Sequence, residues 1–77
     1  MERIKDALIY VFEDFDEGMF NADMKLGDIT DWDSMNSVNL QMELESIFDV
    51  DLSDTILMEK HKISDVIDIL RSAGANI

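Results

Sequence analysis

The stretch from residue 34 to residue 48 constrains the fold more than any other part of this chain. Asp33 and Ser34 stand at its start, and either side chain can cap a helix by accepting a backbone N–H that lacks a partner within the helix. The apolar residues that follow recur at helical spacing. They form one face, made of Leu40, Leu44, Ile47 and Phe48. The pattern predicts a helix over 34–48 with this face buried.

The same stretch carries a second apolar face, made of Met35, Val38 and Met42. At about 100° per residue it lies roughly opposite the first face and on nearly the same side as Ser34. A helix in so small a domain can bury one face fully, so the second is expected to be at least partly exposed. Flexible methionines on an exposed face suit a docking surface for several partners. The alternative is that both faces are core, with helices on either side.

The rest of the chain predicts further helices and one long loop. Residues 2–15 carry apolar side chains on one helical stripe, and Gly18 marks a stop. Residues 16–33 are rich in turn-forming residues, so we expect a loop with a short helical turn, laid over the core. Four apolar residues anchor this loop: Phe20, Met24, Leu26 and Ile29.

The C-terminal third predicts one short helix and one longer helix. Ser53 or Asp54 can cap a short helix within residues 49–63, and Ser64 can cap a helix over 64–73 that stops at Gly74. We therefore expect a single domain over residues 1–77 in the all-α class. Its architecture would be a small four-helix bundle with three main helices, one short helix and a long first loop.

The charge balance indicates which partners the chain can have. Eighteen acidic residues stand against six basic ones, which gives a net charge of −12. Such a surface repels nucleic acids and anionic membranes, and it attracts proteins with basic patches. We expect no nucleic-acid partner and no membrane insertion. The absence of cysteine is compatible with a reducing cytoplasm, where we place the protein.

Neither a catalytic site nor a metal site is predicted. The single histidine, His61, stands in a charged stretch without an orienting partner in the sequence. Asp49, Asp51 and Ser53 begin an EF-hand-like spacing, but its twelfth position, which needs glutamate, holds Lys60. One histidine and no cysteine offer no zinc ligand set. We expect a protein that is not an enzyme.

Ser34 is the strongest candidate for a functional residue. The N-terminus of a helix attracts anions, because its free N–H groups and the helix dipole favour a phosphate there. A serine at this position can carry a phosphodiester; the alternative is a plain capping serine. Ser37, one turn further along, points roughly toward the core face and is expected to be structural.

The stretch from Asp33 to Leu52, DSMNSVNLQMELESIFDVDL, resembles the Asp-Ser-Leu motif and second helix of acyl carrier proteins. Length, acidity and helix order agree over the whole chain, whereas the residue-by-residue resemblance is confined to this stretch. It implies that a separate phosphopantetheinyl transferase attaches 4′-phosphopantetheine from coenzyme A to Ser34, next to its motif neighbour Asp33. The arm would hold acyl groups as thioesters.

The resemblance also implies roles for the remainder of the helix. Acyl-loading, acyl-transfer or synthase enzymes with basic docking patches would bind residues Met35, Val38, Met42, Glu43 and Glu45. The interior that can shelter an acyl chain would be lined by Leu40, Leu44 and Phe48. A monomeric carrier is expected.

The chain departs from the commonest pattern of these carriers. Glycine is usual three residues before the serine, but here that position holds Asp31, which is followed by Trp32. Met35 replaces the usual leucine, and Asn39 stands where an acidic residue is frequent. These departures favour a specialised freestanding carrier, in polyketide-like or other dedicated acyl transfer, over the housekeeping carrier of fatty-acid synthesis. An aminoacyl carrier, such as a D-alanyl carrier, is an alternative within the family. A small acidic helical interaction domain without a prosthetic group is the alternative outside it.

Overall fold

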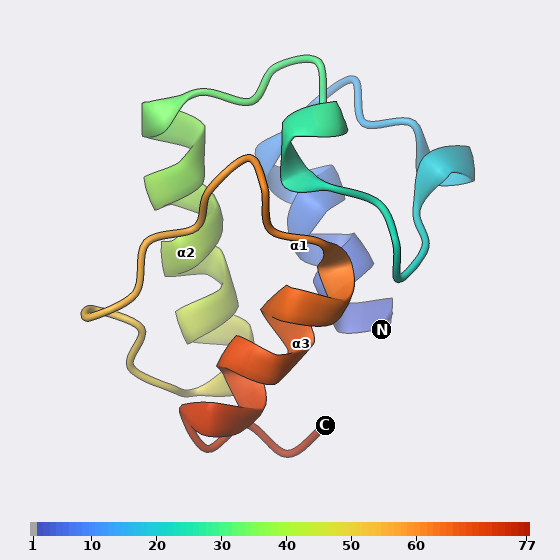
Figure 1. The fold of residues 1–77 in the computed structure, drawn as a ribbon. Coiled ribbons are helices and arrows are strands. Elements are labelled where there is room, and N and C mark those ends of the chain that lie inside the picture. Colours follow the sequence, from blue (N-terminus) through green and yellow to red (C-terminus); the bar gives the residue numbers. More distant parts are fainter. Residues whose placement is uncertain (1) are drawn as a thin grey trace.

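The computed structural model describes residues 2–77 and consists mostly of helices (Figure 1). In chain order the elements are α1 (Glu2–Val11), two 3₁₀ turns (Glu17–Met19 and Leu26–Asp28), α2 (Ser34–Phe48) and α3 (Ile63–Ser72). No strand occurs within these residues, so the all-α class is confirmed. Three α-helices are present in this part of the chain instead of the four predicted.

Helix α1 ends at Val11, four residues before the predicted end at residue 15. The apolar stripe continues past this end, because Phe12 is buried and Phe15 is half-buried without being helical. Phe12 leaves the helix to stack on Trp32, and the ring of Phe15 meets that of Phe20 edge to face. Aromatic packing therefore takes over where the helix stops, and Gly18 lies in the next turn instead of ending α1.

The long loop between α1 and α2 lies over the core, as predicted. Met24, Leu26 and Ile29 are buried, and Phe20 packs against them from a half-buried position. Part of this loop pairs along its backbone with the segment that leads into α3. Four hydrogen bonds make the pairing: Ile63 N–H to Met24 O (2.9 Å), Ser64 N–H to Ala22 O (3.0 Å), Leu26 N–H to His61 O (2.8 Å) and Gly27 N–H to Glu59 O (3.0 Å).

The prediction of a short helix within residues 49–63 is wrong. After α2, Asp49 adopts a left-handed conformation with φ of 54°, and the segment 50–62 runs as turns and extended backbone. Some of its backbone groups are satisfied by turns within the segment, and others by the first loop and by side chains of α2. A local helix is not needed to satisfy those groups.

Helix α3 begins at Ile63, one residue before the predicted start, and its N-cap is Lys62 instead of Ser64. The carboxylate of Asp65 accepts the Lys62 N–H at 2.9 Å, which fixes the first turn from inside the helix. The predicted stop at Gly74 is confirmed. Gly74 has φ of 105°, a conformation that glycine adopts without steric cost.

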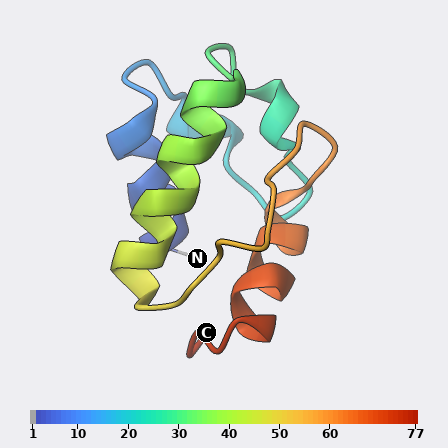
Figure 2. The same ribbon diagram turned by 90° about the vertical axis from the view of Figure 1, so that its left-hand side faces the viewer.

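The core is formed where the inner face of α2 meets α1, α3 and the first loop. Leu40 and Leu44 of α2 are fully buried and belong to one core cluster with residues such as Leu8 of α1 and Leu70 of α3. Figure 2 shows α2 in front, with α1 along one side of it and the segment 49–62 along the other. The guanidinium of Arg3 lies 4.5 Å above the Phe48 ring and ties the start of α1 to the end of α2.

Candidate functional site

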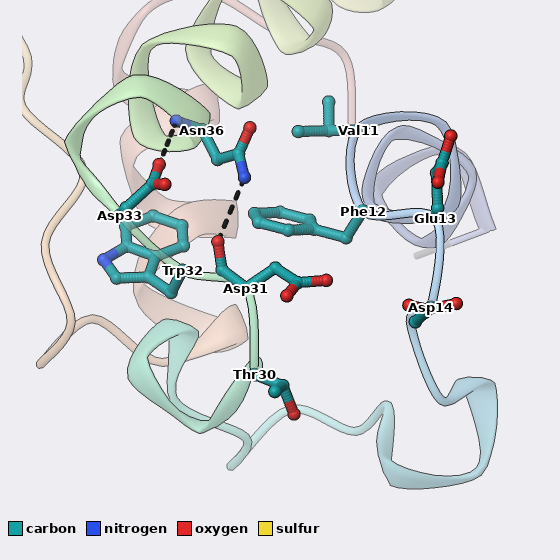
Figure 3. A pocket seen from close by; sticks show the side chains of 9 residues that line it. All are labelled: Val11, Phe12, Glu13, Asp14, Thr30, Asp31, Trp32, Asp33 and Asn36. Carbon is teal, nitrogen blue, oxygen red and sulfur yellow. Dashed lines mark hydrogen bonds between the residues drawn. The ribbon is translucent and has the colours of Figure 1, made fainter.

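The junction that precedes α2 is held in place by two hydrogen bonds (Figure 3). Asp33 has an extended backbone, and its carboxylate accepts the Asn36 N–H at 2.7 Å. The side-chain amide of Asn36 donates back to the carbonyl of Asp31 at 3.0 Å. Trp32 stacks on Phe12 with ring centroids 6.0 Å apart. The loop thus arrives at the helix along a fixed path.

Ser34 is the first residue of α2 and is exposed. Of the two capping candidates, the structure uses Asp33, so the Ser34 hydroxyl is outside the capping hydrogen bond. The first amides of the turn and the helix dipole favour negative charge at this point. Ser34 therefore presents a free hydroxyl at a position that can accept a phosphate.

We predict that Asp33→Ala lowers the free energy of unfolding by about 1 kcal/mol, because the Asn36 N–H loses its acceptor. Asp31→Ala is the matched control, since Asp31 contributes only its backbone carbonyl to the junction. It should change stability by less than about 0.5 kcal/mol. Urea denaturation followed by circular dichroism measures both. Equal losses of stability in the two variants would show that removal of a negative charge, and not loss of the helix cap, causes the destabilisation.

An open groove of about 800 Å³ lies directly beside Ser34. We call it the Ser34 groove. One wall belongs to the start of α2 and the other to the segment 56–60. Its lining residues are Trp32, Asp33, Ser34, Ser37, Val38, Gln41, Ile56, Leu57, Met58, Glu59 and Lys60. Exposed apolar side chains on both walls, Val38 and Ile56 among them, make it a surface for an apolar ligand. Lys60 is the single cationic residue of this lining.

The outer face of α2 is exposed, as expected. Met35, Val38 and Met42 have exposed fractions of 73%, 53% and 60%. We call these three residues the Met ridge. The alternative in which both faces of α2 are core is therefore wrong. The inner face is buried at Leu40, Leu44 and Phe48, which confirms these residues as core. Their role in sheltering an acyl chain stays a prediction.

A row of three polar side chains joins α2 to the segment 49–62. Ser37 Oγ donates to the Leu57 carbonyl at 2.8 Å, and Gln41 Nε2 donates to the Leu52 carbonyl at 2.7 Å. The Glu45 carboxylate accepts the Leu52 N–H at 2.7 Å. The structural role expected for Ser37 is confirmed. Glu45 is half-buried and is already engaged within the fold, whereas the Met ridge faces solvent.

Sequence reasoning missed two parts of this site. Gln41 was not singled out, although residues 37, 41 and 45 repeat every four positions, in a row that begins in the inner face and runs toward the outer one. That spacing is the one local indication of a polar seam. The groove wall at Ile56 and Met58 was missed as well, since a short helix was expected there. Nothing local to those residues places them beside Ser34.

His61 and the acidic spacing that follows α2 both serve the fold. His61 Nδ1 accepts the Met58 N–H at 2.9 Å and holds the turn at one wall of the Ser34 groove. The Asp51 carboxylate accepts the Ser53 N–H at 2.8 Å, which lowers the pKa of Asp51. Among residues 2–77, no group of three or more potential ligands is placed to hold a metal ion. Over the same residues, no helix combines the length and the apolar character needed to cross a bilayer.

The structure brings Asp33, Ser34 and Val38 together at the Ser34 groove, with Met35 and Met42 on the adjoining ridge and Glu43 on the α1 side of α2. No protein-family model, curated protein or solved structure matches the chain. The function must therefore be inferred from the chemistry of these residues and their surroundings.

Proposed function

We propose that this chain is a carrier protein whose Ser34 bears a 4′-phosphopantetheine arm. A separate transferase would attach the arm from coenzyme A, and partner enzymes would load and unload it. One observation carries the proposal: an exposed serine begins a capped helix, and an apolar groove opens directly beside it. A serine that served only as the first residue of a helix would need no such groove.

The residues around Ser34 suit a phosphodiester with a flexible attachment. The first amides of α2 and its dipole would stabilise the phosphate oxygens, and Lys60 supplies a positive charge in the same groove. The apolar walls at Val38 and Ile56 would lie along the arm. When bound, the arm supplies the thiol that carries an acyl group as a thioester. The chain itself has no cysteine to supply one.

The Met ridge is the proposed docking surface for the enzymes that act on the arm. It adjoins Ser34 on the same helix, so an enzyme that binds the ridge meets the attachment point. The net charge of −12 would steer enzymes with basic patches toward the chain. Glu43 can contribute directly to this attraction. Glu45 would act indirectly, because its carboxylate holds the segment 49–62 against α2.

A specialised freestanding carrier is the proposed class. Asp31 and Trp32, which depart from the commonest carrier pattern, both make contacts that stabilise the junction. The Asp31 carbonyl accepts the amide of Asn36, and Trp32 stacks on Phe12. These departures thus belong to a particular way of building the loop that leads to Ser34, and they are compatible with the attachment role.

The proposal predicts covalent modification of one serine. We expect the protein to gain the mass of one phosphopantetheine group when incubated with coenzyme A, magnesium and a broad-specificity phosphopantetheinyl transferase. Ser34→Ala should gain nothing, whereas Ser37→Ala should still be modified, because Ser37 is buried and donates to Leu57. Intact-protein mass spectrometry measures the result. An unmodified parent protein, or a modified Ser34→Ala, would overturn the proposal.

The exposed Met ridge also supports a second candidate, an acidic interaction domain that carries no prosthetic group. This candidate needs the ridge but does not need Ser34. It predicts no mass gain with the transferase and no effect of Ser34→Ala on partner binding. The same mass measurement therefore separates the two functions.

A further inference from the structure

A second groove lies on the opposite side of α2 from the Ser34 groove. It has a volume of about 390 Å³ and is lined by Tyr10, Val11, Asn39, Met42 and Glu43. We call it the Tyr10 groove. Tyr10 is a large aromatic residue in the last turn of α1, and it has an exposed fraction of 75%. The Tyr10 groove lies between α2 and α1, whereas the Ser34 groove lies between α2 and the segment 56–60. Figure 2 shows α1 and the segment 49–62 on the two sides of α2.

An acidic pocket adjoins the Tyr10 groove, since Val11 lines both. The pocket has a volume of about 510 Å³, and four carboxylates line it: Glu13, Asp14, Asp31 and Asp33. Figure 3 shows Asp31 and Asp33 near the stacked rings of Phe12 and Trp32, with Glu13 and Asp14 on the α1 side of the pocket. The one ion pair found in residues 2–77, Lys5 with Glu2, leaves all four carboxylates without a cationic partner.

We propose that this face of α1 and α2 is a docking site for a basic amphipathic helix of a partner protein. An apolar side chain of that helix would fill the Tyr10 groove against Tyr10 and Met42. An arginine or lysine next to it would lie over the acidic pocket, where the carboxylates attract a cation. The groove supplies apolar contact area and the pocket supplies complementary charge, which is the usual division within a protein interface.

The negative charge of the chain disfavours three other ligands for this face: a nucleic acid, an anionic membrane and a second copy of the chain. A nucleic acid or an anionic membrane would be repelled by a chain with a net charge of −12. A second copy of this chain would bring the same charge and the same four carboxylates against the pocket. A cationic protein segment is therefore the occupant that the face fits.

The docking site overlaps the surfaces that the carrier function would use. Met42 lines the Tyr10 groove and also belongs to the Met ridge, and Trp32 and Asp33 line both the acidic pocket and the Ser34 groove. A partner bound at this site would therefore compete with the enzymes that are proposed to dock on the Met ridge. The docking site itself does not depend on modification of Ser34, so it stands even if the carrier function fails.

The test uses a synthetic leucine–arginine peptide that is amphipathic as a helix, and a control peptide with the same residues in scrambled order. Binding to the full chain is measured by isothermal titration calorimetry at low salt. Tyr10→Ser should raise the dissociation constant for the amphipathic peptide about tenfold. The matched variant Ile56→Ser, which removes an equally exposed apolar residue (73%) from the Ser34 groove, should change it less than about twofold.

A second pair of variants tests the acidic pocket. Glu13→Gln combined with Asp14→Asn should weaken binding more than Asp54→Asn combined with Asp68→Asn, which removes the same charge elsewhere. Backbone chemical shifts should move at Tyr10 and Met42 upon titration. Should Tyr10→Ser disturb the helix content, Met42→Ser replaces it as the test of the groove.

Three results would overturn the proposal. The first is equal weakening by Tyr10→Ser and Ile56→Ser. The second is equal affinity of the scrambled and amphipathic peptides, which would mean diffuse charge attraction. The third is a set of shifts centred on Ile56 and Met58, which would place the peptide in the Ser34 groove.

Discussion

Leu44→Ala is expected to lower the free energy of unfolding by about 3 kcal/mol. Leu44 lies in the inner face of α2 and is fully buried between α1, α3 and the first loop. Truncation removes buried apolar surface and leaves a cavity that the surrounding side chains fill only in part. Domains of this size are stable by only about 5 to 10 kcal/mol, so the variant would lose a large share of its stability.

The matched control is Met42→Ala, two residues earlier on the same helix. Met42 belongs to the exposed Met ridge, so its truncation should cost less than about 0.5 kcal/mol. Urea titrations followed by circular dichroism at one temperature give both values. Comparable losses for the two variants would mean that the outer face of α2 is covered in solution, which would contradict the docking role of the ridge.

Helix α2 is the element that could be predicted best, and the reason is local. Its start at Ser34 follows from the Asp33 cap, and its end at Phe48 follows from the last residue of the apolar face. Cap, periodicity and length all lie within one continuous stretch of the chain. Exposure of the Met ridge also followed, because a small domain cannot cover both faces of one helix.

The start of α3 and the segment before it were predicted less well, because non-local contacts decide them. The backbone of residues 22–27 pairs with that of residues 59–64, and this pairing replaces the short helix expected there. Capping by Lys62 depends on Asp65 within the helix, whereas Ser64 donates its N–H to Ala22 in the first loop. The Ser64–Ala22 hydrogen bond joins residues that lie far apart in the sequence, so local capping rules could not find it.

In the candidate site, too, some features follow from local sequence and others from non-local contacts. Ser34 and Asp33 are adjacent in the sequence, and their arrangement follows from helix capping alone. The far wall of the Ser34 groove, at Ile56 and Met58, is brought to the helix by the Ser37–Leu57 hydrogen bond and by the backbone pairing. The exposure of Tyr10 depends likewise on how α1 packs beside α2. Each of these features is a product of the assembled fold.

Gly27→Ala is expected to destabilise the fold by about 1 to 3 kcal/mol, because two backbone segments approach each other closely at this glycine. A Cβ atom at residue 27 would lie 2.9 Å from the Cβ of Glu59 and 3.2 Å from its carbonyl oxygen. The same carbonyl accepts the Gly27 N–H at 3.0 Å. Relieving the clash would therefore stretch a hydrogen bond of the pairing. Alanine also lowers the conformational entropy of the unfolded chain, but this stabilises the folded state by less than about 1 kcal/mol.

Gly18→Ala is the control that isolates this close approach. A Cβ at residue 18 would meet the Asp16 carboxylate oxygen at 3.1 Å, and that side chain can move aside. Its cost should stay below about 1 kcal/mol. Because Glu59 and Lys60 belong to the wall of the Ser34 groove, Gly27→Ala should also shift the amide resonances of residues 56–60. The Gly18 variant should leave these resonances in place. Unchanged resonances in both variants would mean that the first loop does not position the wall beside Ser34.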